Sequence, residues 1–165
     1  MKTIYLAGGC FWGTQHFFDQ FSAVTETETG YANGDTDAPT YQQVCGGSGH
    51  AETVRVVFDE TRMSVEQLLA CYFLTVDPLS VNRQGEDEGV QYRTGIYYAD
   101  ETLLPSIRAA VAAEEAKAGA PLAVEVLPLR RFDRAEEYHQ KYLEKNPAGY
   151  CHIPRRLMHL EDGAK

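Results

Sequence analysis

Apolar positions along the chain follow two periods, and these periods predict its secondary structure. Ile4 and Leu6 alternate with their neighbours, which predicts a strand over about 3–7. Apolar residues from Phe11 to Phe21 recur at helical spacing, which predicts a helix over 11–21. The same reasoning predicts further strands over about 23–31, 50–59, 94–99 and 122–129, and further helices over about 64–75, 101–118 and 133–145.

Residues at the expected helix ends support these predictions. Ser64 with Gln67, and Asp133 with Glu136, have the spacing of capping boxes, in which two side chains satisfy free backbone N–H groups. Gly119 follows the third helix, where a left-handed residue commonly ends a helix. We therefore expect helices to begin near 64 and 133 and to end near 118.

The order of the first six elements predicts the fold class. Strand, helix, strand, strand, helix, strand is the βαββαβ pattern of a ferredoxin-like plait, an antiparallel sheet with helices on one face. We therefore expect an α+β fold, a two-layer sandwich with an extra C-terminal strand and helix. We expect one domain over 1–165, with an irregular tail over about 147–165.

Two expected loops, over about 32–49 and 77–92, are longer than most connections in a compact domain, which is typical of functional loops. Each carries a tyrosine and a carboxylate at or near its end. These are Tyr41 with Glu52, and Asp87 with Tyr92. The sequence therefore singles out these four side chains as candidates for a site.

Composition and charge exclude several classes of function. The chain has 165 residues, of which 44% are hydrophobic, and this suits a globular domain with a substantial core. A formal net charge of −9 argues against nucleic acid or an anionic membrane as a partner. No apolar stretch has the length of a transmembrane helix, and the N-terminus lacks the apolar segment of a signal peptide, so we expect a soluble cytoplasmic protein.

The four cysteines lie too far apart for the ligand spacing of a zinc site, so we expect no metal. Cys10 is the most informative of them, because it lies in the run Gly8-Gly9-Cys10-Phe11-Trp12-Gly13. The run places it on a strand-to-helix turn, where free N–H groups and the helix dipole favour a thiolate. Phe11 and Trp12 would form an aromatic wall beside the sulfur, which suits a small, apolar, electrophilic substrate.

Six motifs in a fixed order resemble those of the A-type peptide methionine sulfoxide reductases, and the match runs through most of the chain. They read Gly9-Cys10-Phe11-Trp12-Gly13, Tyr41-Gln42-Gln43-Val44-Cys45, Gly49-His50-Ala51-Glu52, Asn82-Arg83-Gln84-Gly85 with Asp87, Gly89 and Gln91-Tyr92-Arg93, Tyr138-His139-Gln140, and Asn146-Pro147-Ala148-Gly149-Tyr150-Cys151. Tyr31-Ala32-Asn33-Gly34 is near a further family motif. One departure is Gln15, where the family often has a glutamate.

The resemblance implies reduction of the S-epimer of methionine sulfoxide, free or within oxidised proteins. It implies Cys10 as the nucleophile and Glu52 as a general acid whose pKa must be raised by burial. Tyr41 and Tyr92 would hydrogen-bond the sulfoxide oxygen, with Asp87 orienting a water or a tyrosine.

The resemblance also implies how the enzyme selects its substrate and how it is recycled. Phe11 and Trp12 would hold the methyl group of the substrate, which selects one epimer. Cys151 would condense with a Cys10 sulfenic acid, and thioredoxin would reopen the disulfide. No bound cofactor is needed, and a monomer is the simplest expectation.

Two other functions fit parts of the sequence. A Cys–His hydrolase would use His50 or His139 to activate Cys10, although we expect both histidines to be hydrogen-bonded structural residues. A non-enzymatic module would bind oxidised methionine, or would sense peroxide through Cys10. We expect a structural role for Cys45, with backup resolution as the alternative, and we expect Cys71 in the core.

Overall fold

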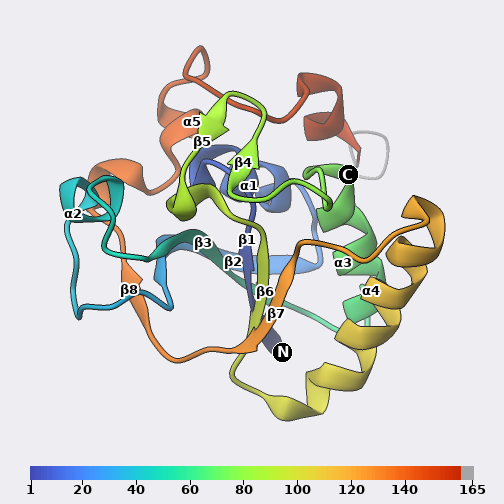
Figure 1. Cartoon of the computed structure of the whole chain (residues 1–165). Coiled ribbons are helices and arrows are strands. Elements are labelled where there is room, and N and C mark those ends of the chain that lie inside the picture. The colour runs from blue at the N-terminus through green and yellow to red at the C-terminus, as the bar shows by residue number, and fades with distance from the viewer. Residues whose placement is uncertain (161–165) are drawn as a thin grey trace.

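The computed structural model describes residues 1–160 and has a six-stranded sheet with helices packed against it (Figure 1). The strands of this sheet are β1 (Lys2–Ala7), β2 (Val24–Ala32), β3 (Ala51–Phe58), β6 (Gly95–Tyr98), β7 (Glu125–Pro128) and β8 (Phe132–Arg134). The α-helices are α1 (Phe11–Asp19), α2 (Tyr41–Cys45), α3 (Val65–Leu74), α4 (Leu104–Ala118) and α5 (Tyr142–Lys145). A two-stranded sheet pairs β4 (Arg83–Gln84) with β5 (Asp87–Glu88).

The strands of the large sheet lie in the order β7-β6-β1-β3-β2-β8. All of its neighbouring strands are antiparallel except β6 and β7, which are parallel. The prediction of an α+β protein with a mostly antiparallel sheet is therefore confirmed.

Alternate residues of β1 enter the two faces of the sheet. Ile4 and Leu6 are fully buried in the main core, where side chains of α1 and α3 cover them. Tyr5 and Ala7 point to the other face, where the Tyr5 ring packs 5.1 Å from the ring of Phe132. The predicted alternation of this strand is thus confirmed, and α4 extends the helical layer by packing against α3 (Figure 1).

Antiparallel register brings the ends of β1 and β2 and the starts of β3 and β6 together at one end of the strands. Ala7, at the end of β1, pairs with Thr53 near the start of β3 and with Gly95 at the start of β6. Tyr31, near the end of β2, pairs with Glu52. The turn after β1 and the loops before β3 and β6 therefore meet at this end of the strands, although they are far apart in the sequence.

The prediction of a helix over about 133–145 is wrong. Residues Phe132–Arg134 form β8 at the edge of the sheet, η3 (Glu137–His139) is a single 3₁₀ turn, and α5 starts only at Tyr142. Lys141 has a left-handed backbone with φ of 55°, which a helix interior does not tolerate.

Long-range partners account for this difference. Asp133 pairs with Tyr31 in the sheet, so it does not cap a helix. Glu136 accepts hydrogen bonds from the Tyr31 hydroxyl (2.7 Å) and from the backbone N–H of Tyr41 (3.0 Å). The expected capping box thus lost both of its members to contacts about one hundred residues away.

Other predicted ends agree with the structure. The capping box of Ser64 and Gln67 is present in full, and Gly119 follows α4 with φ of 69°. The two long loops contain short elements that the pattern did not predict: α2 in the first, and β4, β5 and η1 (Val90–Tyr92) in the second. The predicted tail contains η4 (Arg155–His159), and its last residues, 161–165, lie outside the described part.

Candidate active site

Cys10 occupies the strand-to-helix turn that the sequence predicts, as the residue that precedes α1. Two glycines make this turn possible. A side chain at Gly8 would come within 2.4 Å of Val76, and Gly9 has φ of 77° with the ring of His152 2.9 Å from any added Cβ. The Cys10 residue is 8% exposed, so little of its surface is open to solvent.

The resting state of Cys10 differs from the expected thiolate. Burial is the main cause that raises its pKa, and the charge of Glu52 adds to it, whereas the backbone N–H of Trp12 lowers the pKa. Desolvation and a nearby carboxyl therefore outweigh the helix N-terminus. The resting thiol is protonated, and it must give up its proton as it reacts.

Glu52 is buried on β3 and faces the first turn of α1. Its Oε1 atom accepts a 3.2 Å hydrogen bond from the backbone N–H of Phe11, while its Oε2 atom is buried and has no hydrogen-bond partner among residues 1–160. Burial raises the pKa of Glu52 to about 8, with the Phe11 N–H opposing and Asp87 contributing a smaller increase. At neutral pH this carboxyl is mostly protonated, so it can donate a proton.

Tyr41 begins α2 and Tyr92 ends η1, so the two long loops bring these tyrosines to the same end of the strands as Glu52. Both are half-buried. Burial is the main cause that raises the pKa of each phenol, and the charge of Glu52 is the second. Both hydroxyls therefore remain protonated donors at neutral pH. The carbonyl of Tyr92 also accepts a 3.2 Å bond from the N–H of Gly9, which fastens this loop to the Cys10 turn.

Asp87 lies on β5 and binds a tyrosine that the sequence did not single out. Its Oδ2 atom accepts a 2.9 Å hydrogen bond from the hydroxyl of Tyr150. The charge of Asp87 also raises the pKa values of Cys10, Glu52 and Tyr92 to a lesser degree than burial does. Asp87 thus links the second long loop to the segment that carries Cys151.

The two aromatic residues after Cys10 have different environments. Phe11 is 1% exposed and packs against the rings of Tyr31 (5.7 Å) and His139 (5.1 Å). Trp12 is partly exposed, stacks on Tyr142 at 3.7 Å, and donates a 2.9 Å hydrogen bond from its indole N–H to Nδ1 of His139. Trp12 is therefore the better placed of the two to contact a substrate.

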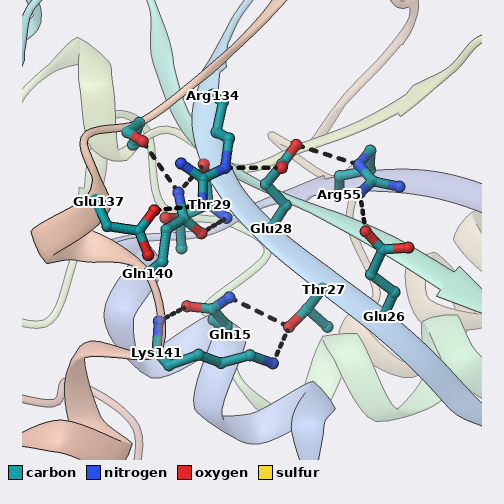
Figure 2. A network of polar contacts seen from close by, with 11 residues as sticks. Gln15, Glu26, Thr27, Glu28, Thr29, Arg55, Arg134, Glu137, Gln140 and Lys141 are labelled. Atoms are coloured by element: carbon teal, nitrogen blue, oxygen red, sulfur yellow. Dashed lines mark hydrogen bonds and ion pairs between the residues drawn. The ribbon is translucent and has the colours of Figure 1, made fainter.

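A polar network fixes the segment that carries His139 against β2 and α1 (Figure 2). The Gln140 amide exchanges two hydrogen bonds with the backbone of Thr29, at 3.0 and 2.9 Å, as a neighbouring strand would. The backbone N–H of Lys141 donates to Oε1 of Gln15 (2.8 Å), and the Lys141 ammonium donates to Thr27 (2.9 Å). The aromatic contacts of His139 thus rest on a rigid support.

Cys151 lies beside α1 in the irregular C-terminal segment. Its Sγ atom is 3.0 Å from the position of a Cβ added to Gly13, which lies one turn from Cys10, and a thiolate at Cys151 would raise the pKa of Cys10. Both thiols are free and form no disulfide in this structure. Burial raises the pKa of Cys151, while the backbone N–H of Ile153 and the charge of Arg155 lower it.

The remaining cysteines and histidines have separate environments. Cys45 is exposed on α2 and interacts with the Tyr41 hydroxyl, and Cys71 is partly buried against the main core. His50 is buried and pairs with the hydroxyl of Ser48 and the carbonyl of Thr36, each at 2.8 Å. His50 is therefore a hydrogen-bonded structural residue, as predicted.

The structure places every site residue that the sequence predicts around the same end of the central strands. Sequence reasoning gave no site role to four neighbours of these residues, namely Glu136, Tyr142, Tyr150 and His152. Tyr150 belongs to the motif that ends at Cys151 and His152 follows that motif directly, which was the available signal. Spacing pointed to Glu136 only as a helix cap and nothing pointed to Tyr142, because the partners of both lie far away in the chain.

Within residues 1–160, no group of three or more His, Cys, Asp or Glu side chains is arranged to hold a metal ion. No helix of that described part is long and apolar enough to cross a bilayer.

Comparisons with known proteins agree with this geometry. The family model described as peptide methionine sulfoxide reductase matches residues 2–162. Peptide methionine sulfoxide reductase MsrA of Clostridium acetobutylicum is 52% identical over 159 residues, which cover 96% of this chain and 98% of that protein. The reduced form of Mxr1 from Saccharomyces cerevisiae has a similar structure, with a TM-score of 0.86 and 36% identity over 91% of this chain and 88% of that one. Mxr1 in complex with Trx2 matches with a TM-score of 0.61 and 22% identity over 86% of this chain and 84% of that one.

Proposed function

The chain belongs to the A-type peptide methionine sulfoxide reductase family and is an oxidoreductase, and we propose that it reduces the S-epimer of methionine sulfoxide through Cys10. One observation carries the assignment of roles. Glu52 is a buried, mostly protonated carboxyl that is hydrogen-bonded to Phe11, the residue next to the only deeply buried cysteine of the described residues. The sulfoxide sulfur is electrophilic but its oxygen is a poor leaving group until it is protonated, so the reaction requires a proton donor beside a thiol.

The first step transfers oxygen from substrate to enzyme. Glu52 donates its proton to the sulfoxide oxygen, and the Tyr41 and Tyr92 hydroxyls donate hydrogen bonds to the same atom. Cys10 loses its proton and attacks the sulfur, so that oxygen passes to Cys10 and the substrate leaves as methionine. The Cys10 proton replaces the one that Glu52 gave, and the sum is thiol plus sulfoxide giving sulfenic acid plus thioether.

The second step closes a disulfide. Cys151 attacks the Cys10 sulfenic acid, its proton joins the departing hydroxyl as water, and an S–S bond forms. The position of the Cys151 sulfur beside Gly13 supports this pairing. A thioredoxin then reduces the disulfide by thiol–disulfide exchange. The complex of Mxr1 with Trx2 supports this choice of reductant, because Mxr1 is 36% identical to this chain.

Substrate selection rests on the aromatic side chains beside Cys10. The partly exposed indole of Trp12 contacts the methyl group of the substrate, while the hydroxyls of Tyr41 and Tyr92 bind its oxygen. Exchanging the oxygen and the lone pair on sulfur, as in the R-epimer, would direct the oxygen away from Glu52. The enzyme therefore acts on one epimer, in free methionine sulfoxide or in a flexible part of an oxidised protein.

The Cys–His hydrolase alternative has little support. His50 is bonded to Ser48 and Thr36, and His139 accepts the Trp12 indole N–H, so neither imidazole has a free acceptor nitrogen near Cys10.

The order and antiparallel pairing of β6, β1, β3 and β2 support a ferredoxin-like plait as the core of the sheet.

A single assay tests this function against its alternatives. Peptides containing S- or R-methionine sulfoxide are incubated with the enzyme and dithiothreitol, and methionine is quantified. We expect repeated turnover of the S-epimer, a large excess over the R-epimer, and no activity for Cys10→Ser. Binding without turnover would instead identify a non-enzymatic module, and turnover by Cys10→Ser would refute the assigned nucleophile.

A further inference from the structure

A hollow of about 330 Å³ lies beside Cys151 and is lined by residues of α1, α5 and η4. Its walls are His16, Leu143, Glu144, Pro147, Cys151, Arg155, Met158 and His159. It contains none of the residues assigned to the sulfoxide, yet a redox thiol forms part of its wall. The proposed catalytic cycle leaves this hollow without a role.

The hollow is built from parts that are held in place. The Gln20 side chain, on the last turn of α1, donates to the carbonyl of Leu157 (2.8 Å) and accepts from the N–H of Leu160 (2.7 Å). These two bonds fix η4 on α1. A second hollow of about 300 Å³ shares His16, Glu144, Met158 and His159 with the first and adds Asp19 and Gln20, so the space extends along α1.

Two opposite charges line this space and have no partner elsewhere. Arg155 and Glu144 are both exposed, and neither forms an ion pair with any of residues 1–160. Apolar side chains of Leu143, Pro147 and Met158 line the same hollow. A cation, an anion and an apolar wall together complement a small molecule that carries a carboxylate, an ammonium group and a short carbon chain.

We propose that this hollow binds a zwitterionic thiol of the amino-acid or short-peptide type, which reduces the Cys10–Cys151 disulfide at Cys151. The proposal rests on the proposed function, because it requires that disulfide. Arg155 would bind the carboxylate of the thiol and Glu144 its ammonium group. Cys151 is the sulfur to be attacked, because it lines the hollow when both thiols are free, whereas Cys10 is buried and does not line it.

The exchange balances in two steps. The thiolate of the bound molecule forms a bond to Sγ of Cys151, the Cys10–Cys151 bond breaks, and its electron pair leaves with Cys10, which takes up a proton. A second thiolate then attacks the bound sulfur and releases Cys151, which also takes up a proton. Two small thiols become one disulfide, and the protein disulfide becomes two thiols.

The experiment begins with the oxidised full-length protein. A single turnover with a methionine sulfoxide peptide should consume two protein thiols, and this first measurement tests the proposed function by itself. If it fails, diamide can form the disulfide instead, so the hollow is still examined. Reduction is then followed with four thiols: cysteine, N-acetylcysteine, cysteamine and 2-mercaptoethanol. Each rate is divided by the rate at which the same thiol reduces a small reference disulfide.

We expect the normalised rate to be highest for cysteine, which carries both charges, and lowest for 2-mercaptoethanol, which carries neither. Arg155→Gln should slow the two thiols with a carboxylate by about twofold to fivefold, the size of an exposed charge pair. Glu144→Gln should slow the two thiols with an ammonium group by a similar factor. Arg156→Gln is the matched control, because it removes the same charge from the next residue of η4, which does not line the hollow.

Equal normalised rates for the four thiols would overturn the proposal. So would equal effects of Arg155→Gln and Arg156→Gln, because the effect would then reflect overall charge. A third contrary result is a loss confined to reduction by thioredoxin, which would assign the surface to a protein partner. In every arm, first-turnover methionine release should match that of the unmodified protein.

Discussion

The indole N–H of Trp12 donates a 2.9 Å hydrogen bond to Nδ1 of His139, which lies 127 residues further along the chain. A ring nitrogen that accepts a hydrogen bond cannot carry the proton, so His139 is neutral and protonated on Nε2. Burial lowers the pKa of His139, with the charge of Glu136 opposing, and thereby favours the same neutral form. The orientation of the exposed aromatic wall thus depends on one protonation state.

Acidification should therefore disturb Trp12. The unfolded chain takes up a proton on His139 near pH 6.5, and the folded chain does so only at lower pH. The free energy of unfolding contributed by this group is thus present above about pH 6.5 and declines as the pH falls. Since Trp12 is the only tryptophan, its fluorescence should change as the pH falls below the ordinary pKa of histidine and His139 takes up a proton. His139→Phe should remove that transition, whereas His16→Gln should keep it.

Replacing the proposed acid should stop catalysis without unfolding the protein. Glu52→Gln keeps the shape of the side chain and can still accept the Phe11 N–H, but it cannot give up a proton. We expect the rate of sulfoxide reduction to fall by about 10²–10⁴-fold. The wild-type rate should also decline above about pH 8, where Glu52 loses its proton, and this decline should be absent in the variant. Glu60→Gln, at an exposed position, serves as the control, and an unchanged rate for Glu52→Gln would remove Glu52 from its role.

The same substitution should change how stability depends on pH. The pKa of Glu52 is raised from about 4.3 in an unfolded chain to about 8 in the folded protein. Its contribution to stability is present at acid pH and is lost as the pH rises toward 8, because the folded chain must release a proton it holds in a buried site. Urea unfolding at pH 5 and pH 8.5 should therefore show a larger loss for wild type than for Glu52→Gln. Equal losses would mean that Glu52 is ionised throughout.

Removing the second thiol should interrupt the cycle after one turnover. Cys151→Ser leaves Cys10 and Glu52 in place, so it should release about one equivalent of methionine and then stop when thioredoxin is the reductant. Dimedone should label Cys10 in the stalled protein. Cys45→Ser, on the exposed face of α2, should sustain repeated turnover. If Cys45→Ser stalled instead, Cys45 would be the resolving residue.

Gln15 should matter for stability more than its neutral charge suggests. The residue is 1% exposed, and its side chain accepts from the backbone N–H of Lys141 and donates to the Thr27 hydroxyl at 3.2 Å (Figure 2). Gln15→Leu should lower the free energy of unfolding by about 1–3 kcal/mol, because it leaves a buried donor unpaired. Gln42→Leu, an exposed control, should change it by less than about 0.5 kcal/mol. Urea titration of both variants measures the difference.

The parts of the fold that depend on nearby residues could be read from the sequence. The Ser64–Gln67 box, the glycine after α4 and the glycine-flanked Cys10 turn involve partners within a few residues, and each is present. The region after 132 could not be read in this way. No helix starts at Asp133, because β2 pairs with β8 there and because Tyr31 and Tyr41 bind Glu136.

The candidate site shows the same division. Motifs identified its members, but the state of Cys10 follows from burial that no local pattern reveals. The helix N-terminus favours a thiolate, yet desolvation and Glu52 reverse that preference. Likewise, His139 and Trp12 meet only because the Gln140 and Lys141 bonds hold a distant segment in place.

Gly13 has a consequence for how the two sulfurs could meet. Glycine within a helix costs about 1 kcal/mol relative to alanine, and here it leaves open the space that the Cys151 sulfur occupies. Cys10 follows directly from β1 and is anchored by the sheet, whereas Cys151 belongs to a segment without regular structure. A Cys10–Cys151 bond would therefore require movement mainly of Cys151. The absence of a Cβ at Gly13 leaves room beside α1 for the sulfur of that residue.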